Sequence, residues 1–507
     1  MGSFFRLPLP LFLVTFTSSV TKKELRSSRA ALFNKVKMRD SIFNEVKNHC
    51  ALTTYKNLIK QFAPLRLKHT KMSKKLWQKN NLSENQHAAL VEKFTIGRDA
   101  EFDLQLAKYD VLGNKAHVKM LATIGLIEES ELPKILEELD NIALQIEEGK
   151  FVIEEGIEDV HSQIEFQLTQ KLGDIGKKIH SARSRNDQVL VDIKLFLKNE
   201  ILEIKDLVKN LFQTLQKLSN QHQDKLIPGY THFQIAMPSS FGLWFGAYAE
   251  ALIDDLEMLL AAYKITNKNP LGSGAGYGSS FPINRTLTTE LLEFETLNYN
   301  VVYAQMTRGK SEKTLATAIS AIAHTLSKLA YDVCLYMNQN FGFITFPDTF
   351  TTGSSIMPHK KNPDIFELIR GKCNILQGVP TELTLLTNNL PSGYHREMQL
   401  TKEVLFPAIN TIKDCLYITE YTLNHIQVKD NILEDEKYQY LFSVENVNDL
   451  VLNGVSFRDA YVQVGQSIEN QYFEPNKNLN HTHEGSIGNL CNEEIKEEFS
   501  KVFEKFK

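Results

Sequence analysis

The stretch DQVLVDIKLFLKNEILEIKDLVKNLFQTLQKLSN (187–220) decides the fold. It lies within 177–227, a run of 51 residues without glycine or proline. At about 1.5 Å per residue, a helix of roughly 40 residues would be about 60 Å long, and we expect Pro228 to end it. Apolar residues recur every three or four positions, the spacing of one buried helix face: Leu190, Ile193, Leu197, Ile201, Ile204, Val208, Leu211, Leu215 and Leu218.

Two further segments have the same helical character. The segments 243–269, interrupted only at Gly246, and 310–341 also lack helix breakers, while alternating strand patterns are rare. We therefore predict a mainly α fold with a central antiparallel bundle of long helices. In segment 187–220, further apolar residues stand beside the apolar seam formed by Leu190 to Leu218, namely Leu195, Phe196, Leu202, Leu207 and Phe212. A second apolar face suggests burial by helices of other subunits in a symmetric oligomer.

Charge divides the chain near Met72. Of the 57 basic and 61 acidic residues, 1–71 hold 14 and 3, a net charge of +11, which leaves −15 for 72–507. We expect 1–71 to be a basic extension outside the fold, either dispensable, a targeting leader, or an over-extended start. The apolar run 7–16 is too short to cross a bilayer. The acidic body is a poor candidate for binding a nucleic-acid backbone.

Cysteine usage points to a reducing compartment. The five cysteines stand at least 39 residues apart, with no zinc-binding or disulfide spacing. We expect inert thiols, a cytoplasmic protein, and neither a membrane nor a nucleic-acid partner.

Two polar segments frame the long helix. EDVHSQIE (158–165) and GKKIHSARSRNDQV (176–189) precede it, and Arg183, Arg185 and Asn186 stand at its start. Such a helix start could bind an anion, although a solvated, capped helix start would have the same composition. PGYTHFQIAMP (228–238) follows the helix, and its His232 could transfer protons near neutral pH, although a structural histidine is the simpler interpretation.

Two further segments are rich in small residues. NPLGSGAGYGSS (269–280) lacks the preceding strand of a dinucleotide site, so we interpret it as a loop that allows close approach of a ligand or a neighbouring chain. TTGSSIMPHKKNPDIFELIRGKC (351–373) places serines and lysines before a helix. That composition suits a loop closing over an anionic substrate, although an ordinary basic loop fits equally well.

The last of these segments resembles the signature loop of the fumarase/aspartase superfamily. The loop Gly-Ser-Ser-x-Met-Pro-x-Lys-x-Asn stands intact at 353–362. HSARSRNDQV, PGYTHFQ, NPLGSGAGYG and LPSGYHREMQLTKE (390–403), in this order, are similar to the argininosuccinate lyase family. The resemblance covers about 76–507.

The resemblance implies a fold and an assembly. It implies a long central helical bundle flanked by two smaller helical domains, and a homotetramer with a 20-helix core. The corresponding domains would be 72–184, 185–434 and 435–507, after the extension 1–71. Family members assemble each active site from three subunits.

The resemblance also implies a reaction, the reversible elimination of fumarate from argininosuccinate to give arginine, without metal or organic cofactor. His232 and Ser354 match the proton-transfer pair. Family descriptions make His232 the proton acceptor, the superfamily loop makes Ser354 the base, and the sequence leaves both open. The residues that match substrate-binding positions, carboxylate-binding cations and a further active-site histidine are Asn186, Thr231, Asn362, Tyr394, Gln399, Lys402, Arg183, Arg185, Lys360 and His161.

Two departures from the family pattern lie near the amino-terminal part of the pocket. The family's Leu-Trp-Gly-Gly-Arg-Phe opening appears only as Leu-Trp-Gln-Lys at 76–79, and a substrate-contacting serine aligns with Gly97. Thr95 or Arg98 could replace the missing hydroxyl. Two other functions compete with the lyase: an inactive structural protein of the lens-crystallin type, and a sister enzyme acting on adenylosuccinate. The retained His232 and Ser354 argue against the first, and segments 180–189 and 390–403 against the second.

Overall fold

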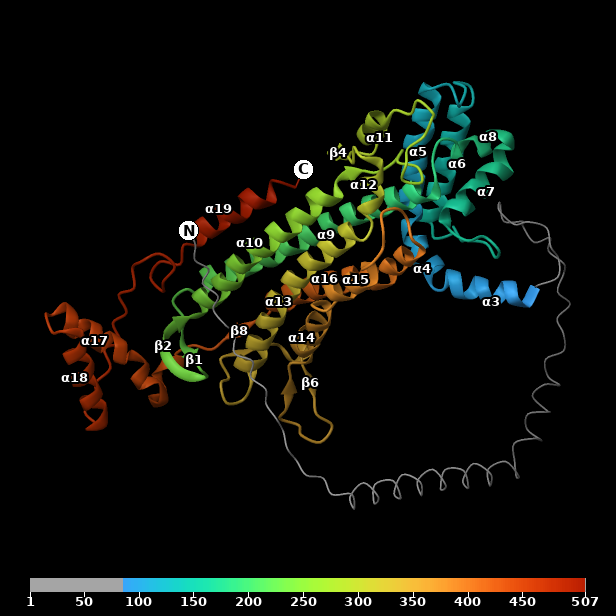
Figure 1. Ribbon diagram of the computed structural model, residues 1–507. Coiled ribbons are helices and arrows are strands. Elements are labelled where there is room, and N and C mark those ends of the chain that lie inside the picture. The colour runs from blue at the N-terminus through green and yellow to red at the C-terminus, as the bar shows by residue number, and fades with distance from the viewer. Residues whose placement is uncertain (1–84, 507) are drawn as a thin grey trace, which may run out of the picture. The chain divides into compact units, whose positions relative to one another are not determined.

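The structure is a computed structural model that describes residues 85–506, so the predicted extension 1–71 and the segment 76–79 lie outside the described residues. The described chain consists mostly of helices, from α3 (Asn85–Ile96) to α19 (Asn492–Phe503) (Figure 1). This confirms the mainly α prediction.

Four long helices run side by side in a bundle (Figure 1). They are α9 (Arg185–Gln221), α10 (Phe241–Thr266), α13 (Lys310–Met337) and α16 (Leu400–Leu423). Helix α9 packs against α10 and α16, and α10 packs against α13. Every residue of the apolar seam predicted from the sequence is buried. The helix has 37 residues, which corresponds to roughly 55 Å.

The second apolar face of α9 is covered by helices of the same chain. The Phe196 ring lies 4.3 Å from the ring of Phe406 on α16, and the Phe212 ring stacks 3.9 Å from Phe499 on α19. Leu195 is buried as well. The prediction that other subunits cover this face was therefore wrong for these residues, because intrachain helices that are distant in sequence already fill the space.

Shorter helices flank the bundle. Helices α14 (Asp364–Leu376) and α15 (Val379–Thr387) cover α13. At the amino-terminal side, α5 (Ala107–Thr123), α6 (Leu132–Glu147) and α7 (Val160–Leu172) enclose a separate apolar core. Helices α17 (Ser443–Leu452) and α18 (Phe457–Glu469) enclose a small third core, whereas α19 packs against α9 and α10. The remaining α-helices are α4 (Asp99–Asp103), α8 (Asp174–Lys177), α11 (Arg285–Leu291) and α12 (Val301–Met306).

The strands of the described chain are short and pair two by two. Strands β1 (Leu226–Thr231) and β2 (Gln234–Ser240) form an antiparallel hairpin, so Pro228 lies in a strand and α9 ends before it, at Gln221. Strands β6 (Thr352–Gly353) and β7 (Lys361–Asn362) form a second hairpin that carries the superfamily loop. The other pairs are β3 (Lys268–Asn269) with β4 (Thr296–Leu297), and β5 (Ile344–Thr345) with β8 (Gln427–Val428).

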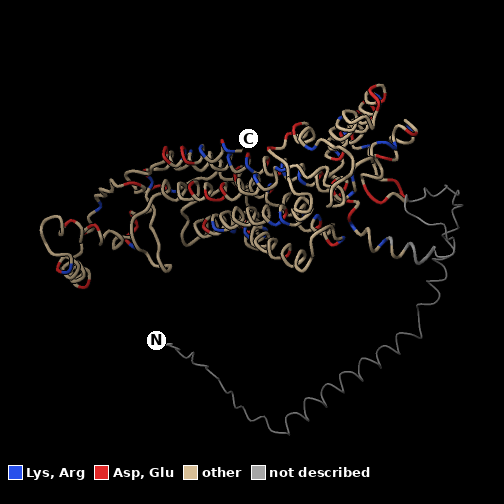
Figure 2. Tube along the Cα trace, turned by 45° about the horizontal axis from the view of Figure 1, so that its top comes forward, with Lys and Arg blue, Asp and Glu red and all other residues tan. Residues whose placement is uncertain are grey.

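Charged residues of both signs are interspersed along the helices (Figure 2). This distribution is unlike the basic face that a nucleic-acid backbone requires. Within 85–506, no helix is both long and apolar enough to cross a membrane.

Candidate active site

The amino terminus of α9 is fixed by a capping box. The Asp187 carboxylate accepts a hydrogen bond from the Ser184 backbone N–H at 2.9 Å, and the Ser184 side chain caps the first turn. The other Asp187 oxygen accepts from the backbone N–H groups of Gly272 and Gly274, each at 2.9 Å. The glycine-rich loop therefore approaches the helix start of its own chain, with φ values of +84° and +59° at these two glycines. Burial raises the pKa of Asp187, even though these donors favour its charged form.

A cavity of about 160 Å³ lies beside this helix start. Its walls come from α9, from the segment 394–402 that leads into α16, and from the region around α4. The fold thus brings together five predicted substrate-binding residues that are far apart in sequence: Arg185, Asn186, Tyr394, Gln399 and Lys402.

Acidic groups surround Lys402 in this cavity. Its ammonium nitrogen lies 2.7 Å from Asp99 Oδ1 and 2.5 Å from Asp103 Oδ1, and only 3% of its side chain is exposed. Burial opposes the charge, but the two carboxylates outweigh it, so the pKa of Lys402 is raised. The pKa of Asp99 is also raised, because burial and the neighbouring Asp103 together outweigh the attraction of Lys402.

The arginines of the cavity are paired. Arg185 lies 3.3 Å from Glu158 and 3.1 Å from Asp159, and Arg396 lies 3.0 Å from Glu158. The Arg308 guanidinium is buried against Glu312 at 2.9 Å. Because planar guanidinium groups hold carboxylates with fixed geometry, these pairs set the shape of the walls.

The segment 394–402 is anchored by hydrogen bonds from two directions. Gln399 Nε2 donates to the Thr95 carbonyl oxygen at 2.9 Å, and Arg396 Nη2 donates to the same oxygen at 3.1 Å. Arg308 Nη2 donates to the Met398 carbonyl oxygen at 2.8 Å. The end of α3 and the short segment before α13 therefore both position this wall.

Two predicted site residues, His161 and Arg183, lie in a buried polar cluster instead of lining the cavity. His161 Nδ1 is 2.9 Å from Asp110 Oδ1 and 3.4 Å from Asp192 Oδ2. Burial disfavours the imidazolium, but the adjacent Asp110 outweighs it and raises the pKa of His161. Burial and the negative charge of Asp110 raise the pKa of Asp192 well above its usual value. Arg183 donates to Asn114, and burial lowers the pKa of its guanidinium.

This cluster also has the donor set of a cation site. One ligand atom each from Asp110, His161 and Asp192 lie within 4.8 Å of one another. The Asp110 carboxylate is already used by hydrogen bonds, from Gln188 Nε2 at 2.7 Å and Asn114 Nδ2 at 2.9 Å. Hydrogen bonding therefore accounts for the position of Asp110 without a metal.

Thr231 and His232 lie at the tip of the β1–β2 hairpin. His232 and Phe233 form its two-residue turn with φ values of +53° and +57°, the left-handed conformation that tight hairpin turns require. Both side chains are exposed. Asn186 stands in the first turn of α9, whereas this hairpin follows the last turn, so the length of α9 separates them.

Ser354, Lys360 and Asn362 lie on the second hairpin. Ser354 Oγ accepts from the Met357 backbone N–H at 3.1 Å, and Asn362 Nδ2 donates to Thr352 Oγ1 at 3.4 Å. Lys360 is exposed. Neither hairpin contributes to the walls of the 160 Å³ cavity, and both lie away from α4 in Figure 1. Within one described chain, the two predicted proton-transfer residues lie on the hairpins together with Thr231, Lys360 and Asn362, away from the five predicted substrate-binding residues that line the cavity.

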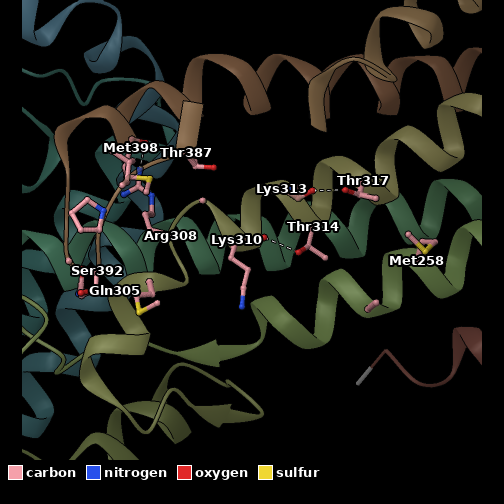
Figure 3. Close-up of a pocket in the computed structure, with 16 residues that line it drawn as sticks. Met258, Gln305, Arg308, Lys310, Lys313, Thr314, Thr317, Thr387, Ser392 and Met398 are labelled. Carbon is pink, nitrogen blue, oxygen red and sulfur yellow. Dashed lines mark hydrogen bonds between the residues drawn. The ribbon is translucent and has the colours of Figure 1, made fainter. Parts of the chain in front are cut away.

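A larger cavity of about 500 Å³ lies between α13, α10 and the segment 387–398. Figure 3 shows Arg308 and Met398 at one end, Met258 at the other, and Lys310 between them. Arg308 lines both cavities, so they are neighbours. None of the predicted catalytic or substrate-binding residues lines the larger one.

Sequence reasoning missed several residues of the 160 Å³ cavity. Glu158 and Arg396 stand inside segments that were singled out, and their charges could have been used. Asp99 stands two residues after Gly97, the position that aligns with the family's substrate-contacting serine. Arg308 carries no local signal, because only tertiary packing brings it to the cavity.

Comparisons with known proteins agree with the fold and the motifs. A family model described as a lyase matches residues 77–378. A solved structure of an EDDS lyase variant with bound fumarate superposes with a TM-score of 0.64 at 20% identity, covering 81% of this chain and 90% of that one. The helical bundle and the intact superfamily loop define a lyase of the fumarase/aspartase superfamily.

Sequence relatives narrow the class. The argininosuccinate lyase of Parabacteroides distasonis is 61% identical over 84% of this chain and 94% of its own length. That of Bacteroides fragilis is 58% identical over 86% of this chain and 96% of its own length. The chain belongs to the argininosuccinate lyase family, a family of carbon–nitrogen lyases.

Proposed function

We propose that this chain cleaves argininosuccinate reversibly into arginine and fumarate, at sites shared between copies of the chain in a homotetramer. The observation that carries the shared site is the length of α9. Asn186 and His232 flank opposite ends of a helix of 37 residues, roughly 55 Å long. Argininosuccinate is much shorter than this helix, so it cannot touch both ends of α9 in one chain. A symmetric assembly can bring the α9 ends of different copies together.

The proposed reaction needs a base, an acid and positive charge. The base removes a proton from the succinyl carbon next to a carboxylate, and the negative charge spreads into that carboxylate, where Lys360 can stabilise it. The carbon–nitrogen bond then breaks, its electron pair goes to the guanidine nitrogen, and the acid supplies a proton there. No group outside the protein and substrate is required.

His232 and Ser354 are the proposed proton-transfer pair. The N–H donated by Met357 to Ser354 Oγ, at 3.1 Å, supports Ser354 as the base, because such a donor favours the ionised hydroxyl. His232 would then supply the proton to the leaving nitrogen.

The substrate is tested by incubating the purified protein with argininosuccinate and, separately, with adenylosuccinate, while fumarate absorbance is followed. We expect release from argininosuccinate only. Release from adenylosuccinate alone would reject the proposal in favour of the sister enzyme, and release from neither would support the structural-protein alternative.

The proton-transfer pair is tested with His232→Asn and Ser354→Ala. Each should lower kcat by two or more orders of magnitude, and light scattering should show that the mass of the oligomer is unchanged. Near-normal turnover in either variant rejects that residue's role. Ser355→Ala, on the exposed neighbour of Ser354, is the matched control and should keep most of the activity.

We also propose a cytoplasmic location. The four described cysteines are free thiols, which supports a reducing compartment. Cell fractionation with an antibody against the protein would check this.

A further inference from the structure

The family serine that aligns with Gly97 has no counterpart at Thr95 or Arg98. The Thr95 hydroxyl donates to the Val91 carbonyl oxygen within α3 at 2.9 Å. The Arg98 guanidinium pairs with Glu101 at 3.0 Å on the surface. From this segment, only Ile96 and Asp99 line the 160 Å³ cavity.

Asp99 and Asp103 differ in the hydrogen bonds and ion pairs that their carboxylate oxygens make. Asp103 is buried, and its two oxygens accept from Lys402 Nζ and from the Val160 backbone N–H at 3.2 Å. Asp103 therefore connects α4, α7 and α16, which is a structural role. The Asp99 side chain is 19% exposed, and its Oδ1 pairs with Lys402 Nζ at 2.7 Å.

The cavity walls carry four cations and four carboxylates, and the buried Glu312 behind Arg308 adds a fifth carboxylate. Arg185 and Arg396 are paired with Glu158 and Asp159, and Arg308 is paired with Glu312. Lys402, the last cation of the walls, faces two carboxylates, so Asp103 alone would neutralise it. A carboxylate of the substrate would meet this excess negative charge, whereas a cationic group would be attracted by it.

We infer that Asp99 binds the α-ammonium group of the arginine half of the substrate and so determines specificity for an α-amino acid. This inference rests on the proposed function. Argininosuccinate carries two cations, but its guanidinium is attached to the bond that breaks and must reach the proton-transfer pair. The α-ammonium group at the opposite end of the arginine half is the cation left for the cavity. Lys402 then acts by holding Asp99 ionised and in position.

The cavity supports this orientation. Its volume of about 160 Å³ suits the amino-acid end of the substrate and not the whole molecule. Asn186, Tyr394 and Gln399 line the same cavity and offer neutral donors for the α-carboxylate. Asp99 thus supplies a negative charge where the family has a serine hydroxyl, and this charge selects a substrate with an α-ammonium group.

The reverse reaction tests the inference. Fumarate is combined either with arginine or with 5-guanidino-2-hydroxypentanoic acid, which carries a hydroxyl in place of the ammonium group. We expect Asp99→Asn to raise KM for arginine about 10-fold to 100-fold, the usual loss when a charge-assisted hydrogen bond is removed. KM for the hydroxy analogue, KM for fumarate and kcat should each change less than about 3-fold.

Two further variants complete the test. Glu101→Gln changes an exposed carboxylate on the same helix and should leave all constants unchanged. Asp99→Glu restores the charge and should recover part of the preference for arginine. A lower KM for arginine in Asp99→Asn would overturn the inference, because Lys402 would then be the binding group for a carboxylate. An equal rise in KM for both compounds would overturn it as well.

The inference and the proposed function can fail separately. If the wild-type protein does not join arginine to fumarate, the proposed function fails. Calorimetric titration of wild-type and Asp99→Asn protein with arginine and with the hydroxy analogue still measures the preference without turnover. Arginine binding that is unaffected by Asp99→Asn would overturn the role of Asp99 alone.

Discussion

At the residue scale, Lys194 shows how a single buried charge connects distant segments. It lies in the middle of α9, has no exposed surface, and donates to the Lys268 carbonyl oxygen at 3.0 Å and to Asn298 Oδ1 at 2.7 Å. These contacts tie α9 to β3, which precedes the glycine-rich loop, and to the residue after β4, which follows the loop. Burial lowers the pKa of Lys194 to about 7.

This pKa predicts how stability depends on pH. The folded value of about 7 lies below the ordinary value of 10.5, so between these two values the unfolded chain binds more protons than the folded one. The free energy of unfolding should therefore rise with pH in this window, by up to about 1.4 kcal/mol per pH unit. Urea unfolding of Lys194→Met at pH 7 and pH 10 should lack this rise. Lys217→Met, an exposed site on the same helix, should retain it, and parallel profiles for the wild type and Lys194→Met would contradict the prediction.

The His161–Asp110 pair gives a second prediction. Asp110→Asn removes the nearest carboxylate of a buried imidazole and leaves only Asp192 at 3.4 Å, which should lower the free energy of unfolding by about 3–5 kcal/mol. The pKa of His161 is raised in the folded state, so the stabilisation is complete below pH 6.5 and is lost as pH rises through the folded pKa. The variant should show a flatter profile across that range in urea unfolding. Asp140→Asn, at a carboxylate that is 65% exposed, should change stability by less than about 0.5 kcal/mol and is the control.

At the scale of elements, local periodicity was sufficient for α9 but not for the hairpin after it. The seam from Leu190 to Leu218 is predictable because every third or fourth residue is apolar over many turns. The β1–β2 hairpin is not, because its turn is His232-Phe233, without the glycine or asparagine that normally marks a left-handed turn. Two non-glycine residues with positive φ cost about 1–2 kcal/mol each, which is a strain often found at functional sites.

The grouping of Asn186, Tyr394 and Lys402 could be predicted only through motif resemblance, since no local pattern connects residues so far apart. Asp99 and Arg308 could not be predicted in this way. Their places depend on how α4 and the segment between α12 and α13 pack against the region around the start of α16. The charge balance that defines the cavity is therefore a property of packed elements.

The junction of α9 with the glycine-rich loop gives a prediction at this scale. Asp187 accepts from three backbone N–H groups, and Asp187→Asn supplies only one oxygen for them. We expect a loss of about 2–3 kcal/mol in the free energy of unfolding. We also expect a higher KM, because the capping box formed by Ser184 and Asp187 positions Asn186, which lies between them. Thermal unfolding and initial rates would measure both. Asp206→Asn, on the exposed face of α9, should change neither, and unaltered stability in Asp187→Asn would mean that the loop is held by other contacts.

At the scale of the whole molecule, the helical bundle keeps two parts of the proposed site apart. Helix α9 holds the 160 Å³ cavity at one end and the exposed His232 hairpin at the other, so a single described chain presents two incomplete parts of the proposed site. The exposed, left-handed turn of the hairpin fits a role in completing the cavity of another copy. If the site is shared as we propose, assembly is a condition for activity.

Mixed assemblies test this arrangement. Asn186→Ala and His232→Asn should each abolish turnover as pure proteins, because every site in such an assembly carries the same lesion. When the two variants are unfolded together and refolded, random mixing should leave about a quarter of the sites with both native groups, since each group comes from a different copy. Argininosuccinate cleavage should then return to about a quarter of the wild-type rate. If each site drew both groups from one chain, every site in the mixture would keep one lesion and activity would stay at the level of the separate variants. Refolding the wild-type protein by the same procedure, in which every site carries both native groups, calibrates the recovery expected from refolding itself.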